Sequence, residues 1–209
     1  MASPVPKHES LSDEALFDRY RRGDTAALRT IIERYQDELY RFLCRLLGDR
    51  TGADDVFQDT FLQIHLSADT FDSERRFRPW LFTIAANKGR DFLRRKIRRQ
   101  TLDLSAPVGG KGADEGGLTY VDLLEIDVAA PDAAMDAKER NERVQLVLNQ
   151  MPLLLREILL LAYFQRLSYA QISSDLEIPL GTVKSRLHAA VASFAKSWKQ
   201  AGLDKMYPS

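Results

Sequence analysis

The 209-residue sequence is poor in the residues that build disulfides and metal sites. It has one cysteine, Cys44, and three histidines that are far apart in the chain, His8, His65 and His188. One cysteine cannot form a disulfide within the chain, and no histidine or cysteine stands at ligand spacing from another. We therefore expect no disulfide scaffold, no metal and no cofactor.

A long apolar run and a net charge are also missing. The most apolar segment, residues 153–164, is too short to cross a bilayer and is interrupted by Arg156 and Glu157. The first residues lack the apolar run of a secretion signal, so we expect a soluble, cytoplasmic protein without membrane insertion. The 30 basic and 30 acidic residues cancel, which excludes an overall attraction to nucleic acid.

Charge is instead segregated along the chain. Residues 88–99 contain seven basic residues and one acidic residue, whereas residues 101–139 contain nine acidic residues and two lysines. Arg90, Arg94 and Arg98 are four residues apart, so their side chains line one face of a helix and repel one another. This pattern indicates a bound anion such as a DNA phosphate. The alternative is a solvated basic helix end, because cations are favourable near a helix C-terminus.

The helical spacing of apolar residues predicts an all-α protein with two small helical domains. In the first half we expect a helix from about Asp13, capped by Ser12, a long helix that stops at Gly48, and helices over 53–66 and 79–99. Residues 101–133 lack a helical period and predict a flexible acidic linker. The predicted organisation is a tail (1–11), a first domain (12–100), the linker (101–133), a second domain (134–200) and a tail (201–209).

The second domain ends in a helix-turn-helix pattern. Ser168 is expected to cap a short helix over 169–176, and residues 177–179 form a turn before a last helix that begins at Leu180. The outward face near the start of this last helix carries side chains that reach bases and phosphates in a major groove: Thr182, Lys184, Ser185, Arg186 and His188.

A loop at residues 69–77 precedes the basic helix. It interleaves Phe71 and Phe77 with Arg75 and Arg76. Aromatic rings stack on bases and arginines meet phosphates, so this combination is typical of binding to single-stranded nucleic acid. The predicted helix over 53–66 has an acidic and polar face that is either solvated or docks on a basic partner.

Three segments, at 53–61, 77–95 and 167–187, together resemble the extracytoplasmic-function type of bacterial RNA polymerase sigma factor. They resemble, in order, the helix that docks on core polymerase, the promoter-melting and −10 recognition segment, and the helix-turn-helix that reads the −35 element. The resemblance implies a non-enzymatic factor without a small-molecule substrate. Such a factor directs core RNA polymerase to specific promoters, aids strand opening, and is controlled by an anti-sigma factor or an envelope or stress signal.

The resemblance also implies residue roles. The residues expected to dock on the coiled coil of the largest subunit of core polymerase are Asp54, Asp55, Gln58, Asp59 and Leu62. The residues expected to bind −10 DNA are Arg75, Arg76, Phe77, Trp80, Asn87, Lys88, Arg90, Arg94 and Arg95. Asn87 is expected just inside the loop that accepts a flipped base. The second domain meets the polymerase flap and binds −35 DNA through the five residues of the last helix. Glu177 stands where the family usually has glycine, which costs about 1 kcal/mol if the backbone there is left-handed.

Three other functions stay open. A sigma mimic would sequester an anti-sigma factor without binding DNA. An ordinary helix-turn-helix repressor or activator would explain residues 153–198 alone. A metal-dependent nuclease would use Asp54, Asp55 and Asp59, although Asp54 and Asp55 are adjacent and point in different directions on a helix.

Overall fold

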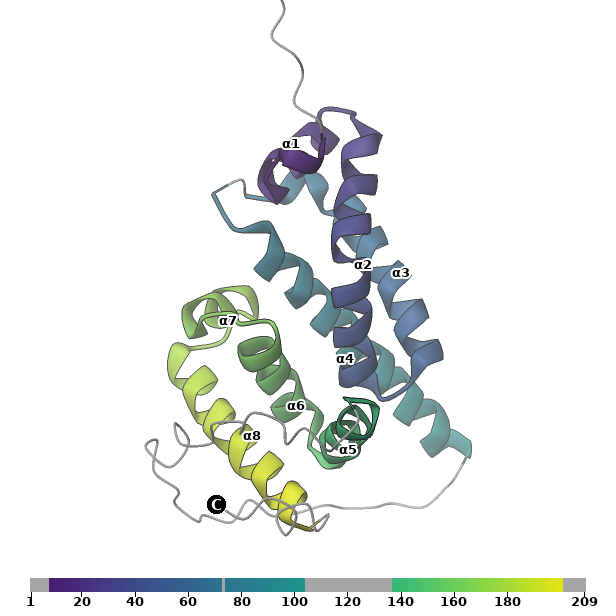
Figure 1. Ribbon diagram of the computed structural model, residues 1–209, viewed down its shortest axis with the longest axis vertical. Coiled ribbons are helices and arrows are strands. Elements are labelled where there is room, and N and C mark those ends of the chain that lie inside the picture. The colour runs from purple at the N-terminus through teal and green to yellow at the C-terminus, as the bar shows by residue number, and fades with distance from the viewer. Residues whose placement is uncertain (1–7, 73, 104–136, 201–209) are drawn as a thin grey trace, which may run out of the picture.

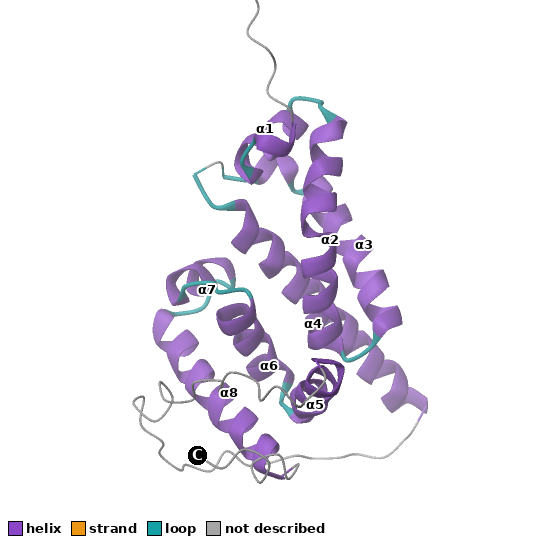
Figure 2. Ribbon diagram, viewed as in Figure 1, coloured by secondary structure: helices purple, strands orange, loops and turns teal. Residues whose placement is uncertain are grey.

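The computed structural model describes residues 8–72, 74–103 and 137–200, which form helices and loops without a strand (Figures 1 and 2). This confirms the predicted all-α class. The N-terminal bundle consists of α1 (Asp13–Arg21), α2 (Thr25–Leu47), α3 (Arg50–Leu66) and α4 (Phe77–Asp103). The C-terminal bundle consists of α5 (Ala137–Gln150), α6 (Leu153–Leu159), α7 (Tyr169–Asp175) and α8 (Leu180–Gln200). No helix in the described ranges is long and apolar enough to span a membrane.

Local signals in the sequence place the ends of the first helices. The Oγ of Ser12 accepts a hydrogen bond from the backbone N–H of Ala15 at 3.2 Å, so Ser12 caps α1 as predicted. Gly48 ends α2 in the left-handed region, with φ of 67°. The tail predicted at 1–11 is partly structured, because His8–Ser10 form a short 3-10 helix and His8 Nε2 lies 2.9 Å from the carboxylate of Asp24.

An aromatic cluster closes the upper end of the N-terminal bundle. Phe17 of α1 packs against Phe71, Phe77 and Trp80, with ring centroids 5.0–5.5 Å apart. Phe71 and Phe77 are buried, so the chain between α3 and α4 is anchored at both ends by rings in the core. This cluster fixes where α4 begins and therefore where its basic face points.

The C-terminal bundle contains the predicted helix-turn-helix. Ser168 and Gln171 form a capping box at the start of α7. The turn that follows includes Glu177 with φ of 54°, so the backbone there is left-handed, the condition under which glutamate is unfavourable. Ser173 Oγ donates to the carbonyl oxygen of Ile178 at 2.7 Å and holds the turn before α8 begins.

The two bundles pack against each other, which the sequence did not predict. Helix α7 lies beside α4, and both α5 and α6 contact α2 (Figure 1). The predicted linker lies outside the described residues apart from its first three positions, which belong to α4.

Candidate nucleic-acid interface

The outer face of α3 carries the residues predicted to dock on polymerase. All five lie on α3, where they are exposed or, for Asp59, half-buried, and Leu62 keeps 56% of its surface exposed. Leu66, which was not predicted, is 68% exposed one turn further on. Exposed leucines rimmed by carboxylates are a surface suited to a partner with basic and apolar groups. In the described parts of the chain, no cluster of three His, Cys, Asp or Glu side chains is arranged to hold a metal ion.

Part of the predicted −10 surface is accessible on α4. Arg94 and Arg95 are both exposed, and their ion pairs with described residues are long, with Asp91 at 3.7 Å and with Asp59 at 3.9 Å. Exposed pairs of this length contribute little to stability, so both guanidinium groups can exchange a carboxylate for a phosphate. Lys88 is tied more closely, since its Nζ donates to Gln63 Oε1 at 2.8 Å.

Asn87 is exposed in the middle of α4 rather than near its start. It lies ten residues after Phe77, which corresponds to about 15 Å of helix. The expectation that Asn87 stands just inside the loop was therefore wrong. Its Oδ1 accepts a hydrogen bond from Arg90 Nη2 at 2.8 Å, so the amide is joined to the arginine row on the same helix.

The loop before α4 differs from its predicted form. Phe77 is the first residue of α4 and has no exposed surface, so the prediction that it stacks on a base is wrong for this structure. Trp80 is half-buried in the aromatic cluster, and Arg76 is exposed. Arg75 Nη2 donates to Ser174 Oγ at 3.0 Å and forms an ion pair with Asp175, both at the end of α7. Arg75 therefore binds the end of α7, whereas Arg76 of the same loop faces solvent.

Arg90 is also committed to the C-terminal bundle. Its Nη2 donates to Glu157 Oε1 of α6 at 2.5 Å, and the Glu157 side chain is only 3% exposed. The predicted row Arg90, Arg94 and Arg98 is therefore interrupted at its first member. Burial raises the pKa of Glu157, although Arg90, Arg186 and Arg94 act in the opposite direction. Burial likewise raises the pKa of Asp175, against the lowering effect of Arg75.

The predicted −35 residues stand on the first turns of α8. Lys184 and Ser185 are exposed, and the other three are half-buried: Thr182, Arg186 and His188. Arg186 also acts electrostatically on Glu157, so it is near the contact between the bundles. Buried Val183 and Leu187 hold this helix against its own bundle, which leaves the opposite face outward, as the spacing predicts.

Sequence reasoning missed the residues that join the bundles. Arg78 donates to both carboxylate oxygens of Glu38, at 2.6 and 2.8 Å, and to Gln165 Oε1 at 3.0 Å. Arg156 and Glu157 interrupt the apolar run, and this was the one feature of the sequence that indicated such contacts, because buried charges need partners. The sequence gives no indication of which partners these are.

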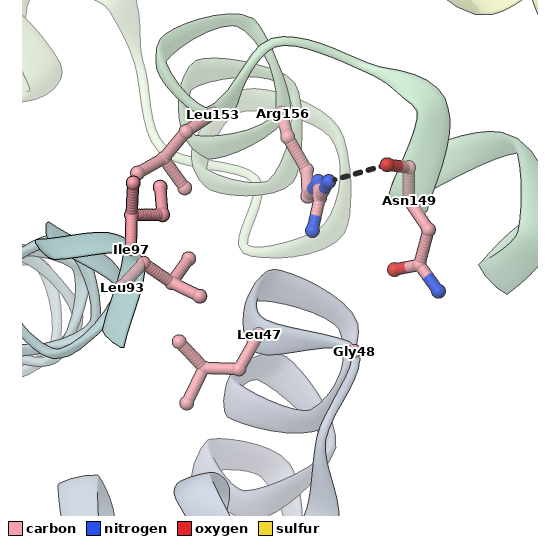
Figure 3. A pocket seen from close by; sticks show the side chains of 7 residues that line it. All are labelled: Leu47, Gly48, Leu93, Ile97, Asn149, Leu153 and Arg156. Carbon is pink, nitrogen blue, oxygen red and sulfur yellow. Dashed lines mark hydrogen bonds between the residues drawn. The ribbon is translucent and has the colours of Figure 1, made fainter. Parts of the chain in front are cut away.

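A shallow pocket of about 340 Å³ marks the seam between the bundles (Figure 3). Leu93 and Ile97 of α4 face Leu153 across it, and Arg156 and Asn149 form its polar side. The pocket therefore lies between the basic end of α4 and the C-terminal bundle.

Two families of known proteins match this chain, one in each bundle. Residues 31–99 match the model for Sigma-70 region 2, and residues 141–193 match that for Sigma-70, region 4. The chain is 33% identical over 168 residues to the ECF RNA polymerase sigma factor SigW of Bacillus subtilis, covering 80% of this chain and 87% of that protein. It is 32% identical to the RNA polymerase sigma factor NccH of Alcaligenes xylosoxydans xylosoxydans, covering 86% and 91%.

Solved structures share the fold. One is CnrH in complex with the cytosolic domain of CnrY, with a TM-score of 0.61, 23% identity and coverage of 90% of this chain and 97% of that one. Another is the sigma factor RpoE in complex with the anti-sigma factor NepR from Bartonella quintana, with a TM-score of 0.58, 21% identity and coverage of 82% and 96%.

Proposed function

We propose that this chain, which belongs to the extracytoplasmic-function family of RNA polymerase sigma factors, divides promoter recognition between its two bundles. As a sigma factor it directs core RNA polymerase to specific promoters for transcription initiation. The observation that carries the proposed division is the order of the matches, with region 2 on the N-terminal bundle and region 4 on the C-terminal bundle. Neither bundle alone would account for both matches.

The face of α3 is proposed to bind core polymerase at the coiled coil of its largest subunit. Asp55, Gln58 and Asp59 supply acceptors for a basic surface, and exposed Leu62 supplies apolar contact. We assign Asp54 to the rim of the same face. The C-terminal bundle is proposed to meet the polymerase flap, which sets the distance between the two DNA-binding surfaces.

Promoter DNA is proposed to meet α4 and α8. Arg94, Arg95 and Lys88 hold phosphates near the −10 element, and Asn87 reads a base edge through its amide. At −35, Lys184, Ser185 and His188 face bases, while Thr182 and Arg186 hold the backbone. The chain itself is proposed to catalyse no reaction and to act in the cytoplasm, where the polymerase performs the chemistry.

An anti-sigma factor is the proposed regulator. Two proteins of the same fold are seen in complexes with partners named as a cytosolic domain and an anti-sigma factor. The mimic hypothesis is disfavoured because Arg94 and Arg95 of α4 and Lys184 of α8 are present and exposed. A repressor would leave the face of α3 without a role.

Competition for core polymerase tests the docking proposal. Asp55→Ala combined with Asp59→Ala is expected to lower the ability of the chain to displace another sigma factor from core enzyme, with the helical circular dichroism unchanged. Asp37→Ala, at an exposed carboxylate of α2, controls for the loss of a surface carboxylate elsewhere and is expected to compete normally. Equal competition by the double variant and the control would contradict the assignment of α3.

A further inference from the structure

We propose that a small cavity between α2 and the π-helical turn η3 (Leu160–Phe164) binds a phosphate group, either as free phosphate or as the phosphate of a nucleotide. The cavity has a volume of about 210 Å³. Pockets for drug-sized ligands measure roughly 300–1,000 Å³, so this one suits a small ion or one group of a larger molecule. None of the residues in its wall has been assigned to DNA or to polymerase, so the inference is independent of the proposed function.

Two arginines of α2 bring positive charge to the cavity. Arg41 and Arg45 are four residues apart, so they lie on the same face of the helix, where like charges repel. Neither guanidinium forms an ion pair with a carboxylate of the described residues, in contrast to Arg78 beside them. Burial, together with the nearby Arg41, lowers the pKa of Arg45. An anion in the cavity would offset both the repulsion and the burial.

The turn η3 holds the Arg45 guanidinium at the cavity. Its carbon atom Cζ lies 4.4 Å from the ring centroid of Phe164, the last residue of η3, which is a cation–π contact. A guanidinium that stacks on a ring keeps the N–H groups of its edge available for oxygen atoms. Single π-helical turns are frequent at functional sites. Arg166, two residues further on, has a left-handed backbone with φ of 54°, and such strained residues also cluster at ligand sites.

Gln165 adds a buried hydrogen-bond donor to the wall. Its side chain belongs to a residue that is only 4% exposed, and its Oε1 accepts from Arg78 Nη2 at 3.0 Å. The amide nitrogen therefore carries the two N–H groups, and it has no hydrogen-bond partner in the described part of the chain. Buried donors normally have a partner, so these N–H groups are suited to a ligand in the cavity that they line.

Glu38 is the carboxylate in the described wall of the cavity, and it does not oppose an anion. Both of its oxygens accept from Arg78, at 2.6 and 2.8 Å, so its charge is already paired. The side chains that remain available, Arg41, Arg45 and the amide nitrogen of Gln165, are all donors. Phosphate oxygens accept such bonds from arginine in a planar, bidentate geometry. The wall therefore favours a phosphate group over a cation or an apolar ligand.

Nuclear magnetic resonance of the isotope-labelled full chain tests this site. The arginine Nε–H and glutamine side-chain signals are followed while sodium phosphate replaces sodium chloride at constant ionic strength and neutral pH, so that screening stays the same. The signals of Arg45 and Gln165 are expected to move and to saturate, whereas that of Arg29, exposed on α2, stays in place. Parallel titrations with adenosine monophosphate and with adenosine identify the source of the phosphate group. Tighter binding of the nucleotide than of phosphate assigns the site to a nucleotide, and equal or weaker binding assigns it to free phosphate.

Arg41→Gln is expected to weaken phosphate binding at least about tenfold, because it removes a charged hydrogen-bond donor at an exposed position that the fold does not need. Arg45→Lys keeps the charge but loses the planar fork, so it is also expected to weaken binding. Arg29→Gln is the matched control and is expected to bind as wild type does. Equal binding by wild type and Arg41→Gln, shifts that do not saturate, or equal shifts with adenosine and its monophosphate would overturn the site. Each of these results would leave the proposed function in place.

Discussion

Arg156 of α6 caps the end of α2. Its Nη1 donates to the carbonyl oxygen of Leu46 at 2.9 Å, and its Nη2 donates to the carbonyl oxygens of Asn149 at 3.0 Å and Met151 at 3.2 Å. The carbonyls at a helix C-terminus lack partners within the helix, so a buried guanidinium there supplies the hydrogen-bond donors that they need. One side chain therefore stabilises both a turn in its own bundle and the end of a helix in the other.

Arg156→Met is expected to destabilise the protein by about 2–4 kcal/mol, because it leaves buried carbonyl oxygens without donors. Urea unfolding followed by circular dichroism measures this change. Arg29→Met, at an exposed position of α2, is the control and should stay within about 0.5 kcal/mol of wild type. A similar small change in Arg156→Met would show that the contact with α2 is not maintained in solution.

Glu157 gives the stability of the fold a predictable dependence on pH. Its pKa is raised by burial, so its contribution is fully present below the unfolded pKa, about 4.3, and is lost as pH rises through the folded value. The stability of wild type relative to Glu157→Gln should therefore fall between about pH 4 and neutral pH. Urea unfolding of both proteins at each pH gives the difference in their free energies of unfolding, in which the effects of the other titrating groups cancel. If the stability of wild type relative to Glu157→Gln increased with pH, the raised pKa of Glu157 would be contradicted.

Glu177 occupies a left-handed turn position that glycine would take without strain. Glu177→Gly is expected to stabilise the protein by about 0.5–1 kcal/mol. Glycine removes the cost of the left-handed backbone at this position, and part of that gain is offset because the unfolded chain becomes more flexible. Thermal unfolding measures the gain. Glu142→Gly, in the middle of α5, should instead cost about 1 kcal/mol. Loss of stability in Glu177→Gly would mean that the glutamate has a compensating contact.

Arg94→Ala combined with Arg95→Ala is expected to weaken promoter binding by the holoenzyme and to flatten its dependence on salt. Each lost phosphate contact should reduce the slope of log K against log salt concentration by about 0.7–0.9. Titration of a labelled promoter at several salt concentrations gives the slope. Arg29→Ala, on an exposed part of α2, serves as the control for the loss of an arginine elsewhere on the surface. A slope equal to wild type would exclude phosphate contacts at α4.

Local chemistry made much of the fold predictable. Ser12, Gly48 and Ser168 mark helix ends by interactions within a few residues, and the structure confirms each of them. The packing of the bundles was not predictable, because Arg156 and Glu157 find their partners 110 and 67 residues away. A pattern of residue types along the chain indicates that such charges need partners but does not select them.

The candidate site was predictable only in part, for a related reason. Interleaved aromatic and basic residues indicated a loop that binds bases, yet Phe77 proved to be core while its neighbour Arg76 is exposed. An aromatic residue beside arginines has the same sequence signature whether its ring faces solvent or the interior. The roles assigned to α3 and α4 are predictions that the variants above test, and the role assigned to α8 is likewise a prediction.

Run-off transcription with purified core RNA polymerase tests the central claim most directly. Core enzyme supplemented with this chain, on fragmented DNA from its own genome, is predicted to make discrete transcripts that core enzyme alone does not make. If soluble, folded chain freed of any bound anti-sigma factor produces no new transcript, the chain does not act as a sigma factor.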